Sequence, residues 1–249
     1  MLTATFSHAP GVGDGTEQKL WNKGILTWEQ ALGHPALPLS PARREALLPV
    51  IEASQGAMER ADWRWFSKNL AGREHWRCVP HLMDRAGFLD IETDGGYGAD
   101  SVTVIGLYDG YESQLFVKGR NLDDFPAAIA EKDLLVTFFG AGFDLPFLRR
   151  RFPELALDQV HVDLCPALRR LGYTGGLKKI ERVLGIQRDD EIESMSGMDA
   201  VYLWQAWQRQ RSQEALDLLL AYNRADIENL ALLLAFAYPR LKTLSGYPG

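Results

Sequence analysis

The chain has 249 residues, of which 46% are hydrophobic and 24% charged, a composition typical of a soluble globular protein with a large core. No run of about 18 apolar residues predicts a transmembrane helix, and the N-terminus lacks the basic start and apolar run of a secretory signal. The formal charge of −6 argues against a protein that coats nucleic acid, but not against an enzyme that gathers acids around metal ions. Cys78 and Cys165 are too few for a zinc cluster or a disulfide framework, so a cytoplasmic location is the simplest interpretation.

The first 85 residues are predicted to be helical. Short helical patterns occur at residues 17–20 and 28–32. A longer pattern covers residues 41–68 and is opened by a Ser-Pro pair, which is a favourable cap and first turn.

The next part of the chain alternates strands and helices. Five runs predict strands, namely FLDIE, SVTVIGLY, SQLFVK, LLVTFF and QVHVDL. Asp109-Gly110 predicts a hairpin turn between the second and third strands. Helices are predicted for LDDFPAAIAEK and for residues 143–151, and again from the last strand to Tyr238.

Three segments are expected from this order of elements. Residues 1–85 would form a small helical region, residues 86–240 an α/β domain and residues 241–249 a tail. Three strands come first in the domain, followed by helix, strand, helix and strand. An antiparallel meander joined to parallel strands is therefore expected, in one mixed sheet flanked by helices.

Acidic residues recur where predicted strands end and helices begin. Asp90 and Glu92 share one strand face, because side chains two apart point the same way, and buried like charges repel unless a cation stands between them. Asp144 follows a buried strand, and Asp226 lies in a helix four residues after Tyr222. Such positions lie along one edge of an α/β sheet, where ligand sites usually form. Carboxylates with few histidines favour Mg²⁺ or Mn²⁺, and a pair of these ions about 4 Å apart suits phosphodiester cleavage.

Each of these acids also has a purely structural interpretation. Asp144 can cap the helix that follows it, and Tyr222 with Asp226 can be an exposed helical pair. Asp163 precedes the Leu-Cys-Pro start of a helix, so we interpret it as an N-cap and keep it out of the ligand set. The order and the positions of the other acids together favour a metal site.

Three segments carry a resemblance to a known family. FLDIET, FDLPFL and YNRAD resemble the three exonuclease motifs of the DEDDy branch of the ribonuclease H-like superfamily. GGLKKIERVLGI, GMDAVYLW and LLLAYNRADIENL are similar to the YprB-like group of predicted exonucleases, and the resemblance covers roughly residues 86–238. It implies a ribonuclease H-like sheet and the metal ligands Asp90, Glu92, Asp144 and Asp226.

The resemblance also implies a role for Tyr222, whose spacing to Asp226 is that of the third motif. Its hydroxyl would help to hold the attacking water. Relatives often carry an asparagine shortly before the second-motif acid, where this chain has Gly140-Ala141-Gly142. One polar contact to the substrate is therefore expected to be missing.

Two further segments are expected to contact nucleic acid. Lys178 follows a Gly-Gly pair at a predicted helix N-terminus, where free amides favour phosphate, and we interpret it as a backbone contact rather than part of a solvated face. HAPGVGDGTEQKLWNKGILTWEQAL resembles a helix-hairpin-helix unit, in which hairpin amides such as those of Gly11 and Gly13 hold phosphates without reading sequence. The alternative is a helical cap that packs Trp21 and Trp28 against the rest of the protein.

The sequence thus predicts a metal-dependent 3′–5′ exonuclease that hydrolyses phosphodiester bonds with two divalent cations, Mg²⁺ or Mn²⁺. The alternatives are a structure-selective endonuclease of the same fold and a nucleic-acid-binding module without catalysis. The expected partner is nucleic acid, as a single strand or a 3′ end, and no membrane partner is expected. The sequence distinguishes neither DNA from RNA nor one oligomeric state from another.

Overall fold

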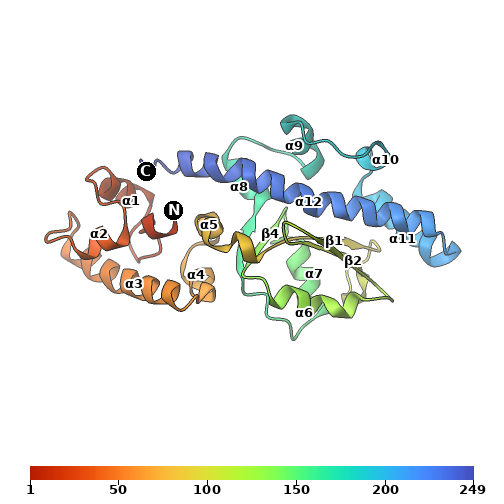
Figure 1. The fold of residues 1–249 in the computed structure, drawn as a ribbon, viewed down its shortest axis with the longest axis horizontal. Helices are drawn as coiled ribbons and strands as arrows, with labels where there is room; N and C mark the ends of the chain where they lie inside the picture. Colours follow the sequence, from red (N-terminus) through yellow and green to blue (C-terminus); the bar gives the residue numbers. More distant parts are fainter.

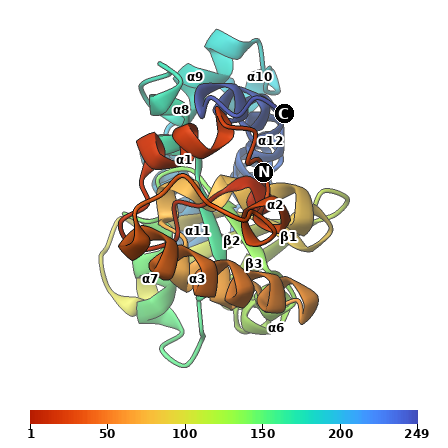
Figure 2. The same ribbon diagram turned by 90° about the vertical axis from the view of Figure 1, so that its left-hand side faces the viewer.

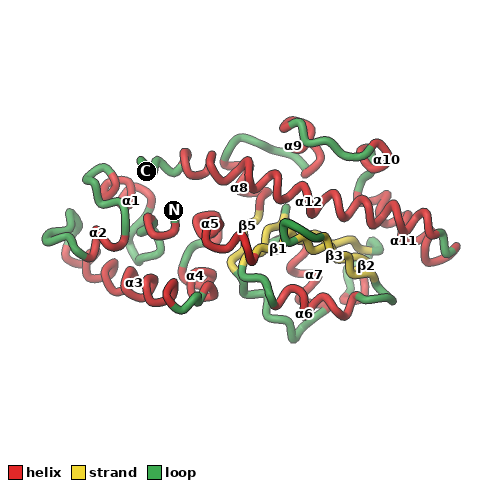
Figure 3. The backbone as a smooth tube through the Cα atoms, in the orientation of Figure 1, coloured by secondary structure: helices red, strands yellow, loops and turns green.

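The computed structural model describes residues 1–249 and contains a five-stranded sheet with the order β3-β2-β1-β4-β5 (Figures 1 and 3). The strands are β1 Ala86–Thr93, β2 Val102–Tyr108, β3 Ser113–Val117, β4 Leu134–Thr137 and β5 Val160–Asp163. β1–β2 and β2–β3 are antiparallel pairs, whereas β1–β4 and β4–β5 are parallel. The predicted mixed sheet, with a meander joined to parallel strands, is confirmed.

Helices cover both faces of this sheet, with α12 across one face and α6 and α7 on the other (Figure 1). The α-helices before the sheet are α1 Asp14–Trp21, α2 Trp28–Leu32, α3 Pro41–Glu59, α4 Trp63–Asn69 and α5 Val79–Leu82. The later ones are α6 Phe125–Ala130, α7 Asp144–Arg151, α8 Leu164–Arg170, α9 Leu177–Leu184, α10 Asp190–Glu193, α11 Gly197–Gln210 and α12 Gln213–Leu244. Short 3₁₀ helices are η1 Leu2–Ala4, η2 Gly72–Cys78, η3 Met83–Arg85, η4 Ala99–Ser101 and η5 Leu122–Asp124. None of these helices combines the length and the apolar content that a membrane span requires.

The alternation of side chains along β1 directs its acids toward α12. Phe88 is buried in the apolar cluster that includes residues of α12, whereas Leu89 and Ile91 are buried with residues of α6 and α7. Asp90 and Glu92 lie two and four positions after Phe88, and side chains at such spacings point to the same face of a strand. They therefore lie on the α12 face of the sheet.

The helical pattern at residues 41–68 forms two helices rather than one. Ala61, in the turn between α3 and α4, has a φ of 53°, which lies in the left-handed region. Asp62 then accepts a hydrogen bond from the backbone N–H of Trp65 at 3.2 Å and caps α4. The single long helix was wrong because aspartate at this position begins a new helix.

The C-terminal helix is longer than predicted. α12 continues past Tyr238 to Leu244 with Pro239 inside it. Beyond it, Tyr247 packs edge to face on Trp21 with ring centroids 5.3 Å apart. The two chain ends therefore lie on the same side of the molecule (Figure 2).

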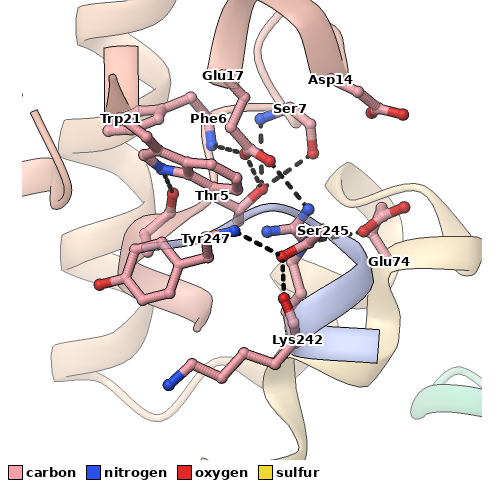
Figure 4. Close-up of polar contacts among 12 residues, drawn as sticks. Thr5, Phe6, Ser7, Asp14, Glu17, Trp21, Glu74, Lys242, Ser245 and Tyr247 are labelled. Atoms are coloured by element: carbon pink, nitrogen blue, oxygen red, sulfur yellow. Dashed lines mark hydrogen bonds and ion pairs between the residues drawn. The ribbon is translucent and has the colours of Figure 1, made fainter. Parts of the chain in front are cut away.

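A buried ion network ties α1 to η2. The Arg77 guanidinium donates to Glu17 Oε2 at 2.9 Å and to Glu74 Oε2 at 2.8 Å. Glu17 Oε1 also accepts from the Thr5 hydroxyl at 2.8 Å and from the Phe6 N–H at 2.6 Å (Figure 4). Because each charge is paired, the N-terminal segment is held in one arrangement without a buried lone ion.

The N-terminal region and the sheet share one apolar core. Trp21 and Trp28 are buried in the same cluster as Phe88 of β1 and Val162 of β5. In the hairpin before α1, Gly11 and Gly13 are exposed, whereas Val12 between them is buried in this core. The region therefore packs against the rest of the protein as a helical cap, which was one of the two alternatives. The two exposed glycines of its hairpin stay accessible to a ligand.

Candidate active site

The predicted acids of the first and third motifs lie together. One carboxylate oxygen each from Asp90 and Glu92 on β1 and from Asp226 on α12 lie within 4.8 Å of one another. β1 positions the first two by side-chain alternation, and α12 brings the third across the sheet. A cluster of three carboxylates at this spacing is a donor set suited to Mg²⁺ or Mn²⁺.

Asn223 holds one of these acids in place. Its Nδ2 donates to Asp90 Oδ2 at 2.9 Å, one helical turn before Asp226 on α12. Gly106 of β2 makes room for it, because a Cβ at that position would overlap Asn223 Oδ1. Sequence reasoning missed Asn223, although its spacing to Asp226 was a usable signal.

Asp144 joins the site through the backbone of β1. Its Oδ1 accepts a hydrogen bond from the N–H of Ile91, between the two acids of that strand, at 3.1 Å. It is buried at the first position of α7 and makes no capping hydrogen bond, so the helix-cap alternative is wrong. Asp144 lies outside the closest acid cluster, which comprises Asp90, Glu92 and Asp226.

All four acids have pKa values above the ordinary value, and burial is the largest cause for each. Burial raises the pKa of Asp90 and of Glu92 well above the ordinary value, and Asp226 and Asp144 raise both pKa values further. Burial raises the pKa of Asp144 to about 7 and that of Asp226 to about 6. Carboxyl groups held together in this way favour either protons or a cation, so the residues present fit a divalent metal.

Tyr222 lines the same cavity as the acids. It is 6% exposed on α12, and burial raises the pKa of its phenol, so the hydroxyl keeps its proton. It is not part of an exposed helical pair, because Asp226 is also buried. The cavity has a volume of about 290 Å³ and is lined by Asp90, Ile91, Glu92, Thr93, Phe143, Gly197, Tyr222 and Asp226.

Lys178 lies beside this cavity. Its Nζ is 4.2 Å from the centroid of the Tyr222 ring and is buried without a hydrogen-bond partner. Burial lowers the pKa of its ammonium. Among the neighbouring basic residues, Lys179 and Arg182 are exposed. Of these three basic residues of α9, Lys178 is therefore the one that packs against Tyr222.

A cation from the loop after α9 pairs with Asp226. Arg188 Nη2 donates to Asp226 Oδ1 at 2.5 Å, and the same guanidinium forms two hydrogen bonds of 2.7 Å to Glu181. Sequence reasoning missed Arg188 and Glu181, since no motif links a loop arginine to an acid on a distant helix.

Asp163 is an N-cap, as predicted. It accepts from the N–H of Cys165 at 3.0 Å, and also from those of Phe139 at 2.8 Å and Ala141 at 3.1 Å. It thereby shapes the loop at Gly140-Ala141-Gly142 that precedes Asp144. In that loop Gly140 is required, because a Cβ would overlap the Thr137 side chain.

Comparison with known proteins identifies the family. A family model described as RNase_H superfamily matches residues 87–238, and the chain belongs to that superfamily. The fold is similar to that of the family B DNA polymerase from the hyperthermophilic archaeon Pyrobaculum calidifontis, with a TM-score of 0.51 and 18% identity over 64% of this chain. The matched region is 25% of the polymerase chain, so this chain spans about a quarter of that protein's length. No curated protein matches the sequence.

The predicted ribonuclease H-like fold is therefore confirmed, whereas membership of the YprB-like group stays a prediction. The cluster of Asp90, Glu92 and Asp226 is compatible with divalent metal ions.

Proposed function

We propose that the protein is a 3′–5′ exonuclease that hydrolyses phosphodiester bonds by a two-metal-ion mechanism. The observation that carries the proposal is the convergence of Asp90, Glu92 and Asp226 within 4.8 Å of one another, in a cavity that Tyr222 also lines. The order of the three motifs supports exonuclease action through the resemblance to the DEDDy branch. The YprB-like group is the more specific assignment that we propose.

In this proposal the acids hold the ions and the remaining residues arrange the substrate. Asp90, Glu92, Asp144 and Asp226 would be the ligands. When bound, a pair of Mg²⁺ or Mn²⁺ ions supplies the positive charge that stabilises the attacking and the leaving oxygen. No covalent intermediate on the protein is needed, and no serine or cysteine nucleophile is proposed.

Two further side chains act on the water and the phosphate. The Tyr222 hydroxyl, which burial keeps protonated, can orient the attacking water by a hydrogen bond. The Lys178 ammonium, beside the Tyr222 ring and without a hydrogen-bond partner, can pair with a phosphate oxygen of the substrate. Gly11 and Gly13 would hold a more distant part of the strand through backbone amides.

The proposal is tested with 5′-labelled single and double strands of DNA and RNA in Mn²⁺. Products that shorten by single nucleotides from the 3′ end are expected. A circular single strand is the matched control, because an exonuclease leaves it intact and an endonuclease opens it. Opening of the circle, or binding without any cleavage, would contradict the proposal and would favour one of the two alternatives.

A further inference from the structure

Arg188 is a buried cation next to the acid cluster, where it can affect the binding of a metal ion to Asp226. Its side chain is 3% exposed and lies between Glu181 and Asp226, both of which are also buried. α9, which carries Glu181, lies along the side of α12 that faces away from the sheet (Figures 1 and 2). A guanidinium this close to Asp226 stands where it can compete with a metal ion for the carboxylate.

Glu181 determines how much of the guanidinium reaches Asp226. Arg188 Nε donates to Glu181 Oε2 and Nη2 to Oε1, each at 2.7 Å, which is the two-bond geometry of a strong arginine–carboxylate pair. Asp226 receives a single hydrogen bond, to Oδ1, from the Nη2 that Glu181 shares. No protein group donates to Asp226 Oδ2, so that oxygen stays open to another ligand.

Glu181 is itself held by the helix that carries Asp226. Asn229 Nδ2 donates to Glu181 Oε1 at 3.0 Å, and Asn229 lies three residues after Asp226 on α12. The four residues therefore form a closed ring of contacts, from Asp226 through Arg188, Glu181 and Asn229 back to α12. Within this ring the guanidinium cannot turn its two-donor edge toward Asp226 without leaving Glu181.

We propose that Glu181 is a positioning residue that restrains Arg188 and so keeps one oxygen of Asp226 free to bind a divalent cation. This inference rests on the proposed function, because it assigns Asp226 to the metal site. If Glu181 is lost, the guanidinium can pair with Asp226 through two hydrogen bonds and exclude the ion. Glu181 thus affects the metal through Arg188 and not by direct contact.

Calorimetric titration with Mn²⁺ in the absence of nucleic acid tests this role. Glu181→Gln removes the charge, whereas Glu181→Asp keeps the charge but is too short to hold the fork of Arg188. We expect both variants to bind Mn²⁺ about tenfold more weakly, since one charged hydrogen-bonded pair is rearranged. The double variant Glu181→Gln/Arg188→Gln should bind Mn²⁺ with nearly the wild-type affinity, because the competing cation is gone.

The comparison of variants separates the possible explanations. If Glu181→Asp binds Mn²⁺ with wild-type affinity, only the charge of Glu181 matters and the proposal is overturned. If Glu181→Gln and Glu181→Gln/Arg188→Gln lose the same Mn²⁺ affinity, Glu181 has a purely structural role and the proposal is also overturned. If Glu181→Gln melts at a lower temperature than wild type in EDTA, the Mn²⁺ affinity of Glu181→Asp alone tests the proposal. The metal site itself is tested separately by Asp90→Asn, and wild-type Mn²⁺ affinity in that variant would contradict the proposed function instead.

Discussion

Asp90 is repelled by all three of the other acids at the site. Burial raises its pKa first, and Asp226, Asp144 and Glu92 raise it further, while Arg188 opposes them. We expect Asp90→Asn to abolish Mn²⁺-dependent cleavage and to raise the melting temperature in EDTA at alkaline pH, because one half-buried charge that the other acids repel is removed. End-labelled substrates and melting curves measure both effects. Full activity in the folded variant would refute the assignment of Asp90.

Tyr222 has a different role from that of the acids in this account. Its hydroxyl would orient water and would not bind metal, so Tyr222→Phe should reduce kcat about 10²-fold, the usual effect of one catalytic hydrogen bond, and leave Mn²⁺ affinity unchanged. Asp226→Asn is the comparison, because it should lose Mn²⁺ affinity. Turnover rates and calorimetric Mn²⁺ titrations of both variants measure this difference. If both variants lose the same Mn²⁺ affinity, the role assigned to Tyr222 is wrong.

The hairpin before α1 is an element whose binding role can be tested without disturbing the core. Gly13 is the exposed N-cap of α1 with extended backbone, and a Cβ there would meet no other atom within 4 Å. Aspartate and asparagine both cap helices well, but only aspartate adds a charge that repels phosphate. We expect Gly13→Asp to bind nucleic acid about tenfold more weakly than Gly13→Asn at low salt, with equal melting temperatures. Equal affinities would remove Gly13 from the binding surface.

The sequence predicted those parts of the site that depend on local periodicity. Alternation along β1 placed Asp90 and Glu92 on one face, and helical spacing linked Tyr222 to Asp226. The contacts that it missed join elements far apart in the chain. Arg188 reaches Asp226 across 38 positions, and no local pattern signals such a pairing.

The same limit explains the outcomes for the fold. The strands of the sheet were predicted from β-branched and aromatic runs, because those runs contrast with their flanks. The break between α3 and α4 was missed, since apolar spacing continued through Ala61 while its backbone adopted a left-handed conformation. The shared core of the N-terminal region and the sheet depends on long-range packing, which periodicity does not report.

For the whole molecule, the acid site makes stability depend on pH. The pKa values of Asp144 and Asp226 rise from the ordinary 3.8 to about 7 and about 6 in the folded protein. The folded state therefore binds these protons more tightly than the unfolded chain. The resulting stabilisation is complete below about pH 3.8 and is lost as the pH rises to about 7.

We therefore expect the metal-free protein to lose part of its free energy of unfolding between about pH 5 and about pH 7. Asp144→Asn should flatten this dependence, because the amide does not titrate, and saturating Mn²⁺ should oppose the loss at the upper end. Urea unfolding in EDTA and in Mn²⁺ across this range measures the effect. An identical slope in wild type and Asp144→Asn would contradict the assigned shift.

The most direct measurement of the central claim is anomalous diffraction from crystals soaked in Mn²⁺ near pH 8, which is above the pKa values of Asp144 and Asp226. The account predicts two anomalous peaks about 4 Å apart, within coordination distance of the carboxylates of Asp90, Glu92 and Asp226. The same soak of Asp90→Asn crystals should lose at least one of them. Manganese peaks elsewhere on the protein, with none among these three acids, would contradict the account.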